Sequence, residues 1–176
     1  MWRMITSDIL DTLVYIPAAL AAGVLVCLLL LIVVRAAHVN GPSVFTLLKV
    51  FVLAAYLLFL FCLVLLSRPA GSRTGVNLIP LGTLGENALF WSYFIENILL
   101  FIPLGMLLPS ILKVYRRLLP CLLTGCFVSL AIEILQFITQ RGYAQLDDVL
   151  TNTLGAGIGY LLFRAAAGLW HGFRKK

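Results

Sequence analysis

The sequence predicts an all-α fold, a polytopic membrane bundle of about five transmembrane helices in a single domain over residues 1–176. Hydrophobic residues make up 62% of the chain and charged residues 11%, with a mean hydropathy of +1.06. A soluble domain carries about 25% charged residues. The few charges also cluster between long apolar runs. Such a chain cannot build a soluble surface, so we expect it to have the bilayer as its solvent.

The first two predicted spans are uncharged apolar runs. A helix needs about 20 apolar residues to cross the hydrocarbon core, and residues 15–34 supply them before Arg35. Residues 50–67 form the second run, which follows a connecting loop over residues 38–43 and is rich in Phe and Leu. We expect the second helix to face lipid. Because the first run exceeds a typical signal-peptide core, we expect it to remain in the mature protein.

The segment that follows the second span, residues 68–86, is rich in Gly and Pro. These residues forbid a continuous helix, although the second half of the segment is apolar. We therefore expect a surface loop or a partly re-entrant loop between the second and third helices.

The last three spans carry polar residues. They are predicted over residues 90–112, 118–138 and 148–170. Trp91 and Tyr93 are suited to anchor the start of the third span at the membrane interface, and Pro103 and Pro109 predict kinks within it. A polar loop over residues 139–147 precedes the last span.

The basic residues predict an orientation, because cytoplasmic loops are enriched in Lys and Arg. With a cytoplasmic C-terminus, nine basic residues lie inside: Arg35, Lys49, Lys113, Arg116, Arg117, Arg164, Arg174, Lys175 and Lys176. Four lie outside: Arg3, Arg68, Arg73 and Arg141. The seven acids then lie at or towards the outer face: Asp8, Asp11, Glu86, Glu96, Glu133, Asp147 and Asp148. We expect a multi-pass protein of the bacterial plasma membrane with its N-terminus outside. Topology and anionic lipid explain the net charge of +6 without nucleic acid.

Polar side chains gather in the outer part of the last three spans. The helical rise places Glu133 about 8 Å below the outer end of the fourth span and Glu96 about 9 Å below that of the third. Helical spacing puts Gln136 on the face of Glu133, and Asn152 on the face of Asp148. The candidate cleft residues are Asn77, Pro80, Glu96, Asn97, Glu133, Gln136, Arg141, Asp147, Asp148 and Asn152.

Two interpretations of this constellation are open. An ionised side chain in the membrane costs about 3 kcal/mol or more, so Glu96 and Glu133 should face the bundle interior, with Arg141 the nearest candidate cation. The residues then form either a structural knot of hydrogen bonds and ion pairs, or a cleft open to the outer face for a polar or amine-bearing ligand. Gly155 and Gly159 predict close helix packing rather than a dinucleotide site, because no strand precedes them.

The four cysteines lie inside apolar runs and lack the spacing of metal ligands. We therefore expect buried thiols and no metal site. We also expect no cofactor, although hard oxygen ligands leave a divalent cation open.

Four motifs carry a resemblance to a known family. They are Asn77-Leu-Ile-Pro80, Glu96-Asn-Ile-Leu-Leu-Phe-Ile-Pro-Leu-Gly105, Glu133-Ile-Leu-Gln136 with Arg141, and Asp147-Asp-Val-Leu-Thr-Asn-Thr-Leu-Gly-Ala156. Over residues 77–160 the chain resembles the VanZ-like membrane proteins of Gram-positive bacteria. The resemblance implies lowered susceptibility to the glycopeptide antibiotic teicoplanin. Many members carry a further acid just before the Asp pair, where this chain reads Ala-Gln-Leu over residues 144–146.

The favoured function is a non-enzymatic membrane protein whose outer cleft engages a glycopeptide antibiotic or a lipid-linked cell-wall precursor. Membrane lipid is an expected partner, and nucleic acid is not. An alternative is an intramembrane hydrolase or transferase acting on a lipid or polyprenyl-linked substrate, with the carboxylates as acid/base pairs or ligands for a divalent cation. Against it, His38 and His171 are predicted on the inner side, away from the carboxylates. A small transporter is the third hypothesis, because broken helices and buried carboxylates occur at coupling sites.

Overall fold

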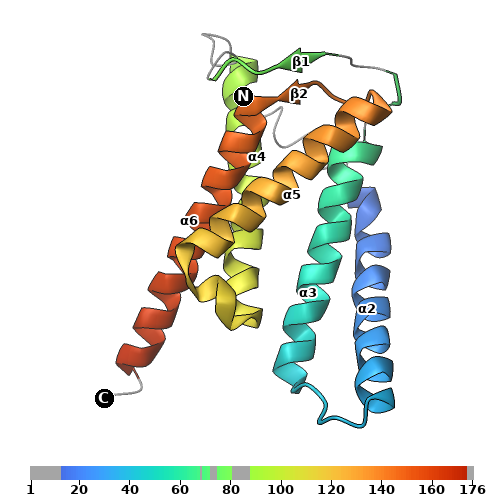
Figure 1. The fold of residues 1–176 in the computed structure, drawn as a ribbon, viewed down its shortest axis with the longest axis vertical. Helices are drawn as coiled ribbons and strands as arrows, with labels where there is room; N and C mark the ends of the chain where they lie inside the picture. The colour runs from blue at the N-terminus through green and yellow to red at the C-terminus, as the bar shows by residue number, and fades with distance from the viewer. Residues whose placement is uncertain (1–12, 68, 72–74, 81–87, 174–176) are drawn as a thin grey trace.

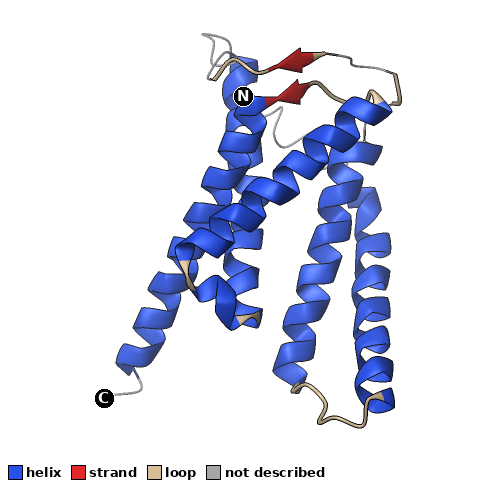
Figure 2. Ribbon diagram, in the orientation of Figure 1, coloured by secondary structure: helices blue, strands red, loops and turns tan. Residues whose placement is uncertain are grey.

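The computed structural model describes residues 13–67, 69–71, 75–80 and 88–173. Within these residues, five long helices make up nearly all of the fold (Figures 1 and 2). The helices are α2 (Ile16–Ala36), α3 (Val44–Phe61), α4 (Ala88–Ile111), α5 (Leu118–Thr139) and α6 (Leu146–Phe173). Two short strands, β1 (Val76–Asn77) and β2 (Ala144–Gln145), pair in parallel. The predicted all-α bundle is confirmed.

Four helical stretches in the described ranges are long and apolar enough to cross a membrane. They are Leu13–Ala36, Val44–Leu66, Trp91–Ile111 and Leu118–Thr139. The first begins with a short 3₁₀ turn, Leu13–Tyr15, that leads into α2. Helix α6 is not among the four, since it opens with Asp147 and Asp148 and carries Arg164 further along. Its 28 residues nevertheless span about 42 Å, and it runs the length of the bundle beside α4 (Figure 1).

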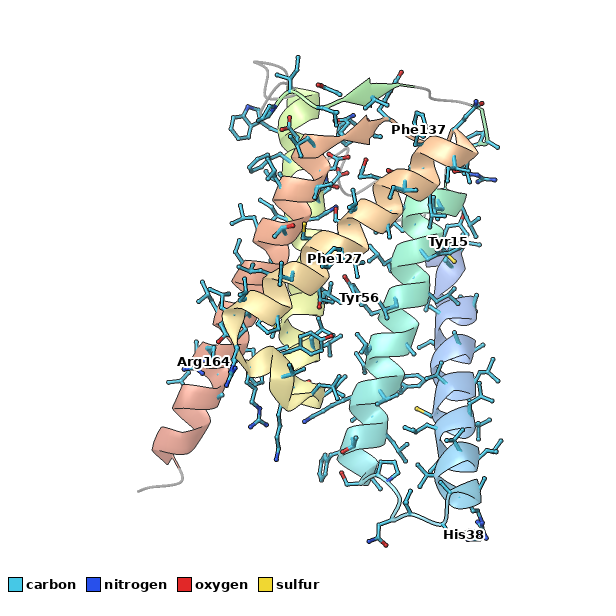
Figure 3. All side chains as sticks on the ribbon, in the orientation of Figure 1. Tyr15, His38, Tyr56, Phe127, Phe137 and Arg164 are labelled. Atoms are coloured by element: carbon cyan, nitrogen blue, oxygen red, sulfur yellow. The ribbon has the colours of Figure 1, made fainter. Side chains whose placement is uncertain are left out.

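The helices run alternately up and down (Figure 1). The α3–α4 and α5–α6 connections lie at the end that carries the two strands, which we call the upper end. The α2–α3 and α4–α5 connections lie at the lower end. His38 and Arg164 lie towards the lower end, and Phe137 lies at the upper end (Figure 3). The α4–α5 connection contains a short 3₁₀ helix, Lys113–Arg116. Its two basic residues, Lys113 and Arg116, and the adjacent Arg117 therefore belong to this lower end.

Helix α3 begins earlier than its predicted start at residue 50, and that boundary is wrong. Ser43 caps the helix, because its side-chain oxygen accepts the N–H of Thr46 at 3.2 Å. Lys49 therefore lies within the first turns of the helix instead of in a flanking loop. At its other end α3 widens into a π turn, Cys62–Leu66, in which the N–H of Ser67 donates to the carbonyl oxygen of Cys62, five residues earlier.

The connection between α5 and α6 is shorter than the predicted polar loop over residues 139–147. Gln140 adopts a left-handed conformation with φ of 54° and ends α5, and α6 begins at Leu146. Between them β2 pairs with β1 in the register Val76 to Ala144. Part of the predicted loop over residues 68–86 thus contacts the α5–α6 connection. Residues 68, 72–74 and 81–87, with Glu86 among them, lie outside the described residues, as do residues 1–12 and 174–176.

Helices α4 and α6 form the closest contact in the fold. A Cβ atom at Gly155 would collide with the carbonyl oxygen of Ile98, and one at Gly159 would collide with that of Ile102. Only glycine lets the two backbones approach this closely. On the other side of α4 the apolar core joins it to α3 and consists of Leu60, Phe101, Leu104 and Leu108.

Candidate functional site

Polar side chains gather at the upper end, where α4, α5, α6 and the end of α3 meet. We call this group the upper polar cluster: Glu96, Asn97, Ser129, Glu133, Gln136, Arg141, Asp147, Asp148 and Asn152. Ser129, Glu133, Gln136, Asp147 and Asn152 are buried. Burial of so many polar groups is tolerated only when they are hydrogen-bonded, so their partners define what the cluster can do.

At the upper end, a hydrogen bond between Asn97 and Asp148 also joins α4 to α6. Asn97 Nδ2 donates to Asp148 Oδ1 at 2.8 Å. Asp148 lies in the first turn of α6, where the helix dipole favours a negative charge. Thr151 Oγ1 donates to the carbonyl oxygen of Asp147 at 2.8 Å. The two adjacent carboxylates are therefore held on an ordered first turn.

Asn152 connects α6 to α5. Its Nδ2 donates to Ser129 Oγ at 2.8 Å, and both residues are buried. Among the described residues, Asn152 Oδ1 is a buried acceptor with no hydrogen-bond partner. Ser129 is not among the residues predicted for the cleft, yet it lies four residues before Glu133 and therefore on the same face of α5. That spacing was a usable signal.

Glu133 ties the two-stranded ribbon of β1 and β2 to α5. Its Oε2 accepts the backbone N–H of Gln145, in β2, at 2.8 Å. The side chain is 4% exposed, so the carboxylate is turned away from the bulk lipid. A carboxylate offers about four acceptor positions, and this contact uses one of them.

Gln136 and Arg141 bind the backbone of the π turn at the end of α3. Gln136 Nε2 donates to the carbonyl oxygen of Val64 at 3.2 Å, and Arg141 Nη1 donates to that of Leu65 at 2.9 Å. The sequence predicts Arg141 only as a partner for carboxylates. It does not reveal these carbonyls, because the second span reads as a regular helix.

Asn77 and Pro80 lie on and just after β1. Asn77 Oδ1 accepts the N–H of Ile79 at 3.1 Å, which is a local turn contact typical of Asn. Pro80 is exposed. These contacts shape the edge of the ribbon rather than the interior of the upper polar cluster.

A groove of about 220 Å³ opens beside Glu133. Its lining residues come from α5, β1, β2 and the start of α6: Val76, Leu78, Leu130, Glu133, Ile134, Phe137, Ala144, Gln145, Leu146 and Val149. Two of these residues, Glu133 and Gln145, are polar. The groove is therefore an almost wholly apolar surface, since Glu133 is only 4% exposed.

The described residues contain no group of three or more His, Cys, Asp or Glu side chains that could hold a metal ion. All four cysteines are free thiols. Cys62 and Cys121 are buried, and Cys27 and Cys126 are partly buried.

The fold and this cluster define a class of protein, a polytopic helical membrane protein with buried polar groups at one end. The model of the VanZ/LLP1 family matches residues 51–169, and the chain belongs to this family. The chain is also similar to Protein VanZ of Enterococcus faecium, with 34% identity over 91 residues, which are 52% of this chain and 53% of that protein. The alignment thus spans about half the length of that relative. No solved structure matches the chain.

The family match confirms the resemblance drawn from the four motifs. It begins within α3 and extends into α6, so it includes every residue of the upper polar cluster. Helix α2 lies outside it.

Proposed function

We propose that this membrane protein lowers the susceptibility of a bacterium to glycopeptide antibiotics of the teicoplanin type. It does so by binding the drug or a lipid-linked cell-wall precursor at its upper end, without catalysing a reaction. Membership of the VanZ/LLP1 family supports this role. The observation that carries it is the upper polar cluster, which lies wholly within the matched region and in which five polar side chains are buried: Ser129, Glu133, Gln136, Asp147 and Asn152.

The chemistry of the upper polar cluster suits a ligand with hydrogen-bond donors or an amine. Asn152 Oδ1 is a buried acceptor without a partner among the described residues, and Asp147 and Asp148 add carboxylates on the same helix. An unsatisfied buried acceptor costs about 1–3 kcal/mol, and a donor from a ligand would recover that free energy. Because the contacts of the cluster join α3, α4, α5 and α6, binding there would also stiffen the bundle.

This role requires the upper end to face the outside of the cell, with the C-terminus in the cytoplasm. The distribution of basic residues supports that orientation, since Lys49, Lys113, Arg116 and Arg117 lie at or near the lower end. In a background without the four native cysteines, a cysteine in place of exposed Pro80 should react with an impermeant maleimide in intact cells. A cysteine in place of exposed Gly41 should react only after permeabilisation. The reverse labelling pattern would refute the orientation.

The proposed function is tested with purified protein in nanodiscs and with growth assays on teicoplanin. The parent protein should bind an acylated glycopeptide or a lipid-linked precursor at micromolar concentration. Glu133→Gln should keep its fold, because the amide oxygen can still accept the N–H of Gln145, yet lose binding and protection. If Glu133→Gln lowered the stability of the protein and its protection against teicoplanin together, the polar cluster would be a structural knot of hydrogen bonds instead.

A turnover assay in the same nanodiscs distinguishes the enzymatic alternative from the binding role. Turnover of a labelled lipid precursor that depends on a divalent cation and disappears in Asp148→Asn would favour an intramembrane hydrolase or transferase. Asp148 is the carboxylate to change because Asn97 fixes its position at the start of α6.

A further inference from the structure

Three exposed arginines lie at the lower end, around the connection between α4 and α5. Arg116 and Arg117 end this connection. Tyr160 Oη donates to the carbonyl oxygen of Arg116 at 2.9 Å, so α6 packs against the connection. Arg164 follows Tyr160 by one turn on the same face of α6, about 6 Å further along the helix axis, and lies at the height of the connection (Figure 3). We call Arg116, Arg117 and Arg164 the arginine patch.

The charge of the arginine patch is not balanced within the described part of the chain. Among the described residues, none of its three guanidinium groups makes a hydrogen bond or an ion pair. All acids in the described ranges belong to the upper polar cluster, at the opposite end of the bundle. The neighbouring lysines are placed differently. Lys49 donates to the carbonyl oxygen of Ser110, and Lys113 follows the last turn of α4, where the helix dipole favours a cation.

The backbone beside the arginine patch adds to the positive field. Helix α5 begins at Leu118, with Arg117 in the N-cap position, and it has neither a side-chain cap nor an acidic residue in its first turn. A helix N-terminus carries partial positive charge and unpaired N–H groups, so the two adjacent arginines have the unfavourable sign there. Helix α6, in contrast, carries Asp147 and Asp148 in its first turn. An anion with several acceptor oxygens, such as a phosphate group, would supply the charge that α5 lacks.

An apolar stripe on α5 identifies the source of that phosphate. Leu119, Leu123 and Phe127 recur every four residues, share one face of the helix and are 65%, 47% and 66% exposed. We call these three residues the α5 stripe. It starts two residues after Arg117 and continues along a helix that can cross a membrane, so it meets acyl chains. A free phosphate would use the arginines alone, whereas a phospholipid uses the arginines and the stripe.

We propose that the arginine patch and the α5 stripe form a site for an anionic phospholipid. The guanidinium groups bind oxygens of the head-group phosphate, and one acyl chain lies along the stripe. A zwitterionic head group binds less well, because the patch repels its ammonium group. The site lies at the opposite end from the upper polar cluster and requires neither an antibiotic nor a wall precursor, so it does not depend on the proposed function.

The test uses the full chain in nanodiscs of equimolar phosphatidylglycerol and phosphatidylethanolamine, followed by native mass spectrometry of the retained lipid. Phosphatidylglycerol should be retained over phosphatidylethanolamine about tenfold or more. Arg117→Gln and Arg164→Gln should each lower this preference about fivefold. The two residues lie on different elements, so one variant answers the question if the other does not fold. The matched control is Arg35→Gln, which removes the same charge from an exposed position in the last turn of α2, at the same end of the bundle, and should leave the preference unchanged.

The outcomes separate the parts of the proposal. Equal retention of the two lipids by the parent would refute the site. An equal loss of preference in Arg35→Gln and Arg117→Gln would show that the total charge of the lower end attracts the lipid, and would refute the assignment to the arginine patch. A millimolar excess of inorganic phosphate should leave the retained lipid in place, and displacement would refute the role of the α5 stripe. Loss of glycopeptide binding with an intact lipid preference would refute the proposed function alone.

Discussion

The bundle has two parts that are built differently, the unit of α4, α5 and α6 and the hairpin of α2 and α3 (Figure 1). Helix α5 buries Cys121, Gly125, Ser129, Glu133 and Gln136. Helix α2 buries only Ala19 and Gly23 among its residues, and most of its side chains are exposed for contact with lipid. The upper polar cluster and most of the family match lie in the three-helix unit. The part with the densest packing is therefore also the part with the candidate site.

The hydrogen bonds that join the two parts are made by side chains to the backbone. Inside the unit, some side chains bond side chains, as in Asn97 with Asp148 and Asn152 with Ser129, and others bond the backbone. Between the parts, side chains bond backbone carbonyls. These contacts are Lys49 to Ser110, Tyr56 to Leu100, Gln136 to Val64 and Arg141 to Leu65. Each of these four contacts ties a side chain of one part to the backbone of the other part.

The largest effect is expected where the unit is densest. Gly155→Ala places a methyl group against the carbonyl oxygen of Ile98, and such overpacking should destabilise the protein by about 3 kcal/mol. The control Gly168→Ala lies on the same helix, where a Cβ atom has no neighbour within 4 Å, and should change stability by less than about 0.5 kcal/mol. Thermal unfolding in detergent compares the two. Equal midpoints would show that α4 and α6 do not depend on this contact.

A smaller effect is expected at the edge of the unit. Glu133→Leu strands the N–H of Gln145, which should cost about 2 kcal/mol. Glu133→Gln keeps an acceptor and should cost about half as much or less. Denaturation of the two variants side by side measures the difference. If Leu were tolerated as well as Gln, the ribbon would not be held by Glu133.

The sequence predicted the helices and the faces of the polar residues because both depend on local spacing. Apolar runs and the helical period placed Glu133 with Gln136, and Asp148 with Asn152. The same reasoning identified the family motifs. Four of the five helices are also long and apolar enough on their own to cross a membrane. Helix α6 is not, and it packs closely against α4.

The sequence could not predict which polar groups meet between helices. Nothing in local spacing shows that Asn152 turns towards Ser129 on α5, or that Arg141 meets the carbonyl of Leu65. The carbonyl of Leu65 belongs to a π turn, which hydropathy does not reveal. The ribbon of β1 and β2 pairs only two residues on each strand, too few to show an alternating pattern.

The hydrogen bond that attaches the hairpin to the three-helix unit gives a finer test of the division into two parts. Tyr56 Oη donates to the carbonyl oxygen of Leu100 at 2.7 Å and joins α3 to α4. Tyr160 Oη donates to the carbonyl oxygen of Arg116 at 2.9 Å and stays within the unit. Each change to Phe should cost about 1 kcal/mol. Only Tyr56→Phe should broaden distances between spin labels on α3 and α4, and broadening in Tyr160→Phe alone would contradict the division into two parts.

The smallest effect is expected at Lys49, where the hairpin meets the lower end of the unit. Its Nζ donates to the carbonyl oxygen of Ser110 at 3.0 Å, and this contact is exposed. A cation near the last turn of α4 complements the helix dipole, which is worth about 0.3–1 kcal/mol at an exposed site. Lys49→Met should therefore lower stability by about 0.5 kcal/mol, and Lys49→Arg should retain it.

Combining Lys49→Met with Tyr56→Phe shows whether the hairpin is held by independent contacts. The two residues lie two turns apart on α3, about 10 Å along its axis, and bond different residues of α4. Effects at such a separation usually add to within about 0.5 kcal/mol. Additive losses in thermal unfolding would mean that each contact holds its own part of α3. A combined loss well above the sum would mean that α3 moves as one rigid rod, so that losing both contacts frees the whole hairpin from the unit.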